Sequence, residues 1–137
     1  MVYPPGERSV ESYRGLGAWV DSFDADPAYS RRVPVVKAAD VVEMASHGVE
    51  TLFLQAARTN DRSGLATSDP WVLADFLLYG HRNGVDVVAW YLPMWAPDGQ
   101  DLDRLLALHR FEVLGHRFNG LAVDIEWNGG GLQHPER

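Results

Sequence analysis

Three glycine turns divide this chain into units of equal length. The turns are His47-Gly48-Val49, Asn83-Gly84-Val85 and Asn119-Gly120-Leu121, so the glycines stand 36 residues apart, and an apolar run follows each one. Helical solenoids have repeats in this range, but they place no apolar strand between their helices. The repeat therefore predicts αβ units, which pair their strands in parallel through right-handed crossovers.

Hydrophobic periodicity predicts four strands with a helix between successive strands. The predicted strands cover residues 16–24, 51–57, 85–92 and 120–127, and the predicted helices cover residues 35–46, 70–83 and 101–114. The second helix has the clearest start, with Asp69 as N-cap and Pro70 in the first turn. We expect residues 1–13 to form an irregular arm and residues 14–137 to form one domain.

Each predicted helix has an apolar face at helical spacing. The expected core residues are Ala38, Val41, Val42 and Ala45 in the first helix, Trp71, Ala74, Leu77 and Leu78 in the second, and Leu102, Leu105, Leu106 and His109 in the third.

Two architectures accept this order of strands, an open doubly wound sheet and a barrel. Doubly wound nucleotide-binding folds usually carry a glycine-rich turn after the first strand, whereas residues 22–26 are acidic and lack GxGxxG. The barrel is therefore favoured. A complete (β/α)8 barrel takes roughly 250 residues, so 137 residues supply about half of it. We predict an α/β half of a TIM barrel, with about four strands and three helices and the strands in sequential order.

Composition excludes several classes of function. The net charge is -7 and Lys37 is the only lysine, so we expect neither nucleic acid nor a membrane surface as a partner. There is no cysteine, and the five histidines show neither HxH nor HExxH spacing, so no metal and no cofactor are expected. The N-terminus lacks the apolar core of a signal peptide, so the sequence as written predicts a cytoplasmic protein.

Two acids follow the apolar core of the last predicted strand. Asp124 and Glu126 stand two residues apart and so share one face of the strand, and Asp21 ends the first strand. Ligand sites of parallel α/β folds lie at the carboxyl ends of the strands. A pair of carboxylates suits glycoside hydrolysis, in which one acid donates a proton and the other is ionised. The competing interpretation is that these are solvated acids at a strand end.

Aromatic residues gather at the same predicted strand ends. Such rings stack on the apolar C–H faces of sugars, although core packing is the competing use for each of them. Gln55 and Arg58 end the second strand, where they suit sugar hydroxyls or a carboxylate, or serve as a core partner and a solvated residue. The aromatic candidates for substrate binding are Trp19, Trp90, Tyr91, Trp95 and Trp127.

The strand motifs carry a resemblance to a known family. Residues 17–21, 51–55, 87–93 and 120–126 are similar to the N-terminal half of uncharacterised actinobacterial TIM-barrel proteins of the glycoside-hydrolase-like superfamily. More loosely, they resemble lysozyme-type and chitinase-type barrels, in which Asp-x-Glu ends strand four. The resemblance implies that Glu126 is the general acid and that Asp124 and Asp21 support it. Many such barrels take a nucleophile from strand seven, which this chain does not contain.

The resulting prediction is a carbohydrate-active domain, a glycoside hydrolase that uses strand-end carboxylates. One alternative is a non-catalytic, truncated half-barrel that binds sugar or only assembles with a partner. Another is an open α/β domain that binds a different small molecule at its switch point. A half-barrel leaves two strand edges and an inner apolar face uncovered. We therefore expect a homodimer, or a chain that pairs with the missing C-terminal half of the barrel.

Overall fold

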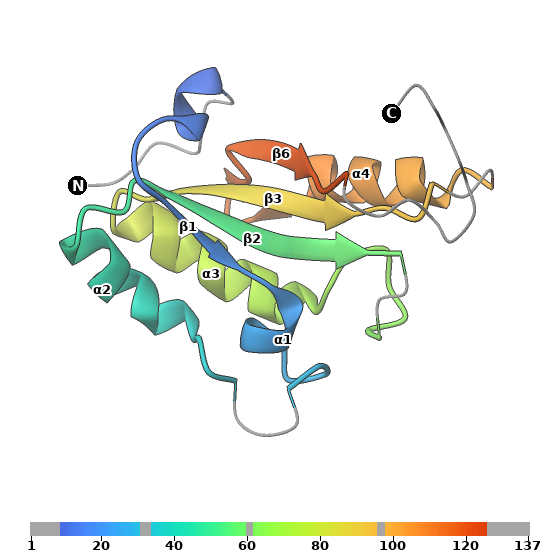
Figure 1. The fold of residues 1–137 in the computed structure, drawn as a ribbon, viewed down its shortest axis with the longest axis horizontal. Helices are drawn as coiled ribbons and strands as arrows, with labels where there is room; N and C mark the ends of the chain where they lie inside the picture. The colour runs from blue at the N-terminus through green and yellow to red at the C-terminus, as the bar shows by residue number, and fades with distance from the viewer. Residues whose placement is uncertain (1–8, 31–33, 60–61, 96–97, 126–137) are drawn as a thin grey trace.

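The computed structural model describes residues 9–30, 34–59, 62–95 and 98–125. A parallel sheet forms its centre, in the order β1-β2-β3-β6 (Figure 1). The predicted parallel pairing in sequential order is confirmed. The four strands are Gly17–Val20 (β1), Thr51–Arg58 (β2), Asp86–Leu92 (β3) and Gly120–Val123 (β6).

The strands are staggered along the sheet. Trp19 pairs with Phe53, Phe53 with Val88, and Val88 with Gly120, so one level of the ladder joins all four strands. β1 begins at Gly17, two residues before this level, whereas β6 begins at it. Gly17, Thr51 and Asp86 are level, so β1, β2 and β3 begin together and only β6 begins two residues farther along.

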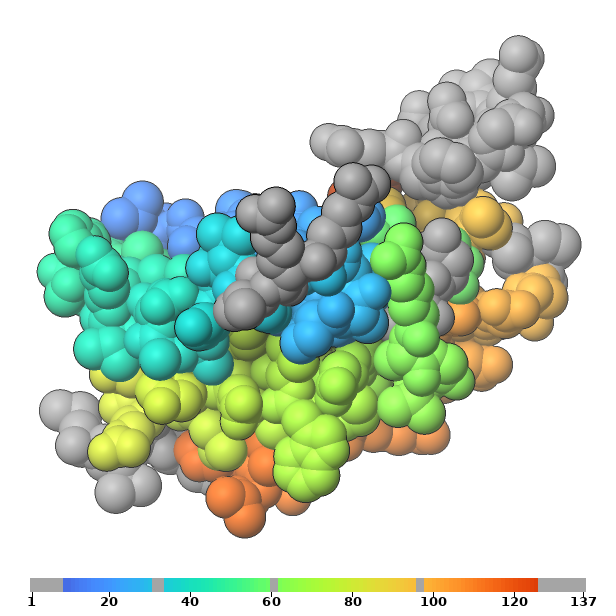
Figure 2. Space-filling view, turned by 90° about the horizontal axis from the view of Figure 1, so that it is seen from below, coloured from blue at the N-terminus to red at the C-terminus, as the bar shows by residue number. Residues whose placement is uncertain are grey.

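The helices that connect these strands lie on one face of the sheet. In Figure 1 the strands cross in front of α3, and in the view from below the atoms of α2 lie next to those of α3 (Figure 2). One-sided helices are what sequential right-handed crossovers produce. The described helices in this part of the chain are α1 Ser22–Ala25, η2 Ala38–Asp40, α2 Val41–Ser46, α3 Pro70–Arg82 and α4 Gln100–Arg110, where η denotes a 3-10 helix.

The core lies between the sheet and these helices. Alternate strand residues point toward the helices and are almost completely buried, whereas their neighbours point to the other face. Leu108 of α4 is also fully buried against this cluster. The central core residues are Leu52, Leu54 and Ala56 of β2, Val87, Ala89 and Tyr91 of β3, and Leu73, Phe76 and Leu77 of α3.

The core faces of three helices differ from the prediction, and in α2 the expected core residue Val42 is 49% exposed. Trp71 of α3 is 81% exposed because it lies in the first turn, and Leu73 and Phe76 take the buried positions. In α4, Leu102 is 60% exposed, whereas Leu108 is fully buried. The apolar pattern of each helix is wider than the face that the sheet covers. Periodicity therefore predicted where the helices are, but not which side of each helix faces the sheet.

The helix boundaries follow local capping. Asp69 accepts a hydrogen bond from the Trp71 N–H at 2.9 Å, and Pro70 occupies the first turn, as predicted. The predicted helix over residues 35–46 is shorter than expected and starts as the 3-10 helix η2. Gly48 follows it with a φ of 87°, a conformation that glycine adopts without a steric penalty.

The third predicted helix ends earlier than expected. α4 stops at Arg110, and a small hairpin of β4 (Glu112–Val113) and β5 (His116–Arg117) follows it. Leu114 and Gly115, with φ angles of 50° and 80°, form the turn between them. Two-residue strands are too short to show an alternating pattern, so periodicity does not predict them.

The predicted N-terminal arm contains a packed element. η1 (Val10–Tyr13) follows Ser9, and Ser12 is buried where it donates to an Asp86 carboxylate oxygen at 2.6 Å. Tyr13 reaches across the open face and donates to the backbone carbonyl of Leu121 at 2.8 Å. A 3-10 helix of four residues has no periodicity to detect. This segment nevertheless ties the amino-terminal ends of the strands together.

Within the described residues, the face of the sheet opposite the helices is covered only where η1 crosses it. Trp19, on this face, is 63% exposed. None of the described helices combines the length and apolar character that a membrane span requires.

Candidate functional site

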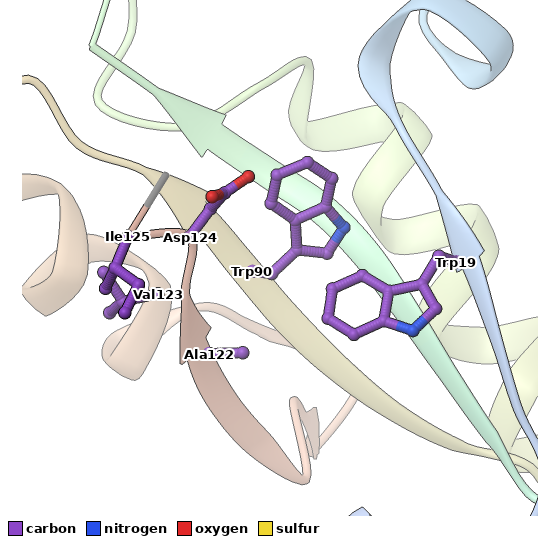
Figure 3. Close-up of a pocket in the computed structure, with 6 residues that line it drawn as sticks. All are labelled: Trp19, Trp90, Ala122, Val123, Asp124 and Ile125. Atoms are coloured by element: carbon purple, nitrogen blue, oxygen red, sulfur yellow. The ribbon is translucent and has the colours of Figure 1, made fainter. Parts of the chain in front are cut away.

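A hollow of about 420 Å³ lies on the open face, toward the carboxyl ends of the strands. Trp19 of β1 and Trp90 of β3 form one side of it, and Asp124 lies directly after β6 (Figure 3). The remaining lining residues are Ala122, Val123 and Ile125. The structure thus brings together three of the predicted site residues, which come from three different strands.

The register of the sheet places the aromatic rings of this site. Trp19 and Phe53 are opposite each other in the ladder, and their rings stack with centroids 4.3 Å apart and planes 8° apart. Trp90 is tilted against Trp19, with centroids 5.9 Å apart. Ring pairs in this range contribute about 0.5–1.5 kcal/mol beyond the area they bury. Phe53 therefore holds the exposed Trp19 ring in a fixed orientation.

Trp90 faces the hollow with its ring, whereas its indole nitrogen is buried. Its indole Nε1 is buried and has no hydrogen-bond acceptor among the described residues. In Figure 3 the ring lies between the Asp124 carboxylate and Trp19. The hollow therefore has an aromatic wall with a carboxylate at one end.

The position of Asp124 is set by the sheet. Its backbone N–H donates to the Tyr91 carbonyl at 2.9 Å, which continues the β3 to β6 ladder one residue past Val123. Strand alternation directs the Asp124 side chain to the open face, as Figure 3 shows. A carboxylate in this place accepts hydrogen bonds from hydroxyl or amide donors.

The Asp21 carboxylate is engaged in a helix cap, which was not predicted from the sequence. It is the N-cap of α1, and its carboxylate accepts hydrogen bonds from the N–H groups of Phe23 at 2.8 Å and Asp24 at 3.0 Å. Gln55 supports the same turn, because its buried side-chain oxygen accepts from the Ser22 N–H at 2.8 Å. Both residues shape the end of β1 and do not line the hollow.

Arg58 is turned toward the segment that follows α1. Its guanidinium lies 5.2 Å from the ring centre of Phe23 and 5.3 Å from that of Tyr29. Cation–π contacts of this kind contribute about 0.5–1 kcal/mol at exposed sites. Arg58 therefore packs the loop beside the strand ends and is outside the hollow.

Tyr91 lies on the helix side of the sheet and cannot stack on a ligand in the hollow. It is fully buried and donates to an Asp101 carboxylate oxygen at 2.5 Å. Burial, followed by this hydrogen bond and the Asp101 charge, raises the pKa of Tyr91 far above its usual value of 10.0. The side chain therefore joins β3 to the start of α4 and does not line the hollow.

The other predicted residues fall outside the hollow or outside the described chain. Trp95 is 37% exposed in the loop after β3 and has a φ of 60°, which is uncommon for a non-glycine residue. Glu126 and Trp127 lie outside the described residues, so their predicted roles stay predictions.

A second polar cluster lies among β3, β5 and α3, away from the hollow. The buried His81 Nε2 donates to the Asn119 side-chain oxygen at 2.7 Å, because this oxygen already accepts from the Val87 N–H. His81 Nδ1 then accepts from His116 Nδ1 at 2.8 Å. Burial lowers the pKa of His81 below its usual value of 6.5, which keeps the ring neutral.

This histidine cluster joins three elements of the fold. It ties the β4–β5 hairpin to α3 and β3 through two tautomer-specific hydrogen bonds. The part of the chain that the structure describes contains no group of three or more His, Asp and Glu side chains arranged to hold a metal ion.

Two residues of the open face were not among the predicted site residues. Phe53 backs Trp19, and Tyr13 lies 6.3 Å from Phe53, between ring centres. Phe53 could have been predicted from its position, because it lies two residues into its strand, as Trp19 does in β1. Tyr13 had no comparable signal, since it precedes the sheet.

Comparisons of this chain with family models, with curated proteins and with solved structures find no match. The site is therefore interpreted from its own geometry.

Proposed function

We propose that this chain is half of a TIM-type barrel and that it binds carbohydrate in the hollow of its open face. The observation that carries the proposal is the combination of an exposed, backed indole ring with a carboxylate at the carboxyl ends of parallel strands. Barrel enzymes place their ligands at this end.

The stagger of the strands supports the half-barrel. A barrel of eight strands and shear eight shifts its register by about one residue per strand, or about three over three junctions. The observed shift in strand starts is two residues and falls at the β3–β6 junction, since β1, β2 and β3 begin at one level. One-sided helices agree with this architecture, whereas a doubly wound sheet carries helices on both faces.

The shape of the open face also supports a curved sheet. Trp19 on β1 and Ala122 on β6 line the same hollow although β2 and β3 lie between these strands. Neighbouring strands are about 4.8 Å apart, so the two edges of a flat sheet of four strands are separated by roughly 14 Å. A concave sheet and the length of the Trp19 side chain together account for the shared hollow.

The chemistry of the lining suits a sugar ring. The Trp19 ring is 63% exposed and Phe53 supports its rear face, so it offers a rigid apolar platform to the C–H face of a sugar. Asp124, at the same hollow, provides an acceptor for sugar hydroxyls. Few polar groups in a mostly apolar hollow are typical of small-molecule sites.

Hydrolysis at the same site is the second function that we propose. Asp124 is on the open face, and strand alternation predicts that Glu126, two residues later, shares that face. Glu126 is then the predicted proton donor and Asp124 the carboxylate that stabilises charge. A non-catalytic domain that binds sugar keeps the aromatic platform and needs neither role.

Calorimetric titration with cellohexaose, maltohexaose and chitohexaose tests sugar binding. Trp19→Ala removes the platform and is expected to weaken binding about tenfold, or about 1.4 kcal/mol. Trp71→Ala is the matched control, because Trp71 is exposed on α3 and does not line the hollow. An equal loss in both variants, or no heat with any of the three sugars, contradicts the proposal.

A further inference from the structure

We propose that a second copy of this chain closes the open face, with β6 of each copy pairing in parallel with β1 of the other. The hollow then becomes a composite site, in which Asp124 of one copy lies beside Trp19 of the other. This inference rests on the proposed half-barrel, and it identifies the partner as an identical chain.

The two edge strands fit this pairing. Within the described residues, β1 pairs only with β2 and β6 pairs only with β3. Gly17–Val20 and Gly120–Val123 contain no charged residue and no proline, which are the devices that protect exposed strand edges in natural sheets. Both edges therefore present a backbone ladder that is ready for another strand.

Symmetry selects how the edges pair. All four strands run in the same direction, so a two-fold axis parallel to them brings β6 of each copy beside β1 of the other at two equal junctions. The result is a closed sheet of eight parallel strands without an edge. A two-fold axis across the strands pairs like with like in antiparallel fashion and leaves the other edges open.

The open face and its edges carry apolar area on the scale of an interface. Trp19 and Tyr13 are 63% and 45% exposed, which leaves roughly 250 Å² of aromatic side chain in water. Leu16, Val123 and Ile125 at the two edges are 55%, 40% and 74% exposed. A specific protein interface buries roughly 800 Å² on each partner, and these side chains supply a large part of that area.

Barrel closure fixes the register of the junction. The shear is the register shift that accumulates around a closed barrel. A shear of eight residues, shared by two identical halves, gives a shift of about four residues for each half. Gly120 is level with Trp19 through the sheet, so a shift of four places it beside Gly15 or Phe23 of the second copy. Phe23 lies in α1, so that register places no residue of β6 beside β1, whereas the register on Gly15 places Ala122 and Val123 beside Gly17 and Ala18 of β1. The two-residue shift between β3 and β6 runs in the same direction.

This register determines which side chains meet. Ala122 is level with Gly17 of the second copy, so two small residues adjoin on the open face and leave room in the interior. Val123 is level with Ala18 of the second copy on the helix side. Asp124 is level with Trp19 of the second copy, which places a carboxylate beside the aromatic platform.

Sedimentation equilibrium of the full chain at micromolar concentration is the first test. A dimer of twice the 15.3 kDa chain mass is expected. A compact monomer with sharp side-chain NMR signals overturns the proposal and assigns the open face to another chain segment. Sugar binding by such a monomer leaves the proposed function standing, whereas a dimer that binds none of the three hexasaccharides leaves only the assembly standing.

Disulfide trapping is the second test, and the absence of native cysteine makes it clean. Chains with Ala18→Cys are mixed with chains with Val123→Cys, because Cα atoms on adjacent strands fall within the span of a disulfide. Leu16→Cys mixed with Val123→Cys is the matched control, since Leu16 is two residues out of register. The first pair is expected to cross-link at least tenfold more than the control.

The cross-linking pattern distinguishes the two ways of pairing. A dimer in which Ala18→Cys and Val123→Cys chains give a higher cross-linking yield than Leu16→Cys and Val123→Cys chains supports the parallel junction. A dimer in which Ala18→Cys or Val123→Cys chains cross-link mainly to themselves overturns it in favour of antiparallel pairing of like edges.

Discussion

The two faces of the sheet are built from the same strands but differ in what covers them. On the helix side, Leu52 and Leu54 of β2 are 0% and 1% exposed. On the other side, Phe53 lies between them in sequence and is only partly buried under Trp19, which is itself 63% exposed. The same alternation that builds the core therefore also builds an apolar face that, among the described residues, only η1 crosses.

This difference separates stability from function. The helix side already has its partners within the chain, and its side chains are close packed. The open side places aromatic rings and a carboxylate around one hollow at the strand ends. A large exposed apolar face is uncommon on a monomer and marks an interaction surface.

The largest expected effect sharpens the contrast between the faces. Phe76→Ala empties a core position that is 2% exposed and is expected to lower the free energy of unfolding by about 3–5 kcal/mol. Phe53→Ala, on the open face, is expected to lower it by less than half as much. Urea unfolding of both variants measures the difference, and equal losses would show that the open face is a second core.

Glu126→Gln tests whether the open face supports hydrolysis. Glutamine keeps the size of the side chain but donates no acidic proton, so hydrolysis of an unactivated oligosaccharide is expected to fall about 10²-fold or more. Glu43→Gln, on the exposed side of α2, is the control. Unchanged turnover moves the acid elsewhere, and a native chain without turnover restricts the site to binding.

Gly120→Ala tests whether η1 covers the open face at the amino-terminal ends of the strands. A methyl group at this position would collide with the Tyr13 hydroxyl, so a loss of about 1–3 kcal/mol in unfolding free energy is expected. In a Tyr13→Ala background the same substitution should have little effect, because the two changes are coupled through one contact. Equal losses in both backgrounds would show that Tyr13 does not seal this end.

A smaller effect is expected from pH on the covered side. The pKa of His81 is lowered by burial, so below about 6.5 the unfolded chain binds a proton that the folded chain does not. Stability should therefore fall as the pH drops from 6.5 toward the folded pKa. His81→Gln should lose this part of the pH dependence in urea unfolding, and an unaltered profile in that variant would assign it to other groups.

Sequence patterns predicted the parts of the fold that repeat. The glycine turns located the strands because each must be followed by an apolar run, and one-directional crossovers then determined their order. The Asp69-Pro70 start was readable because capping is local chemistry. Helix rotation was not readable, since Trp71 belongs to an apolar stripe that extends beyond the sheet.

The candidate site was predictable where strand alternation controls it. Trp19, Trp90 and Asp124 converge because parallel strands bring their carboxyl ends to one edge. Asp21 and Tyr91 lie outside the hollow for different reasons. Asp21 is the N-cap of a four-residue helix that shows no periodic pattern. Tyr91 follows Trp90 directly in β3, so strand alternation turns it to the helix side.

One spectrum tests the claim that the open face is the binding surface. The chain has five tryptophans, and each indole N–H gives a separate signal in a ¹H–¹⁵N correlation spectrum of the labelled protein. On addition of cellohexaose, maltohexaose or chitohexaose, we expect the Trp19 and Trp90 signals to shift while the Trp71 signal stays in place. A shift of Trp71 without Trp19, or no shift of any indole with any of these sugars, would contradict the account.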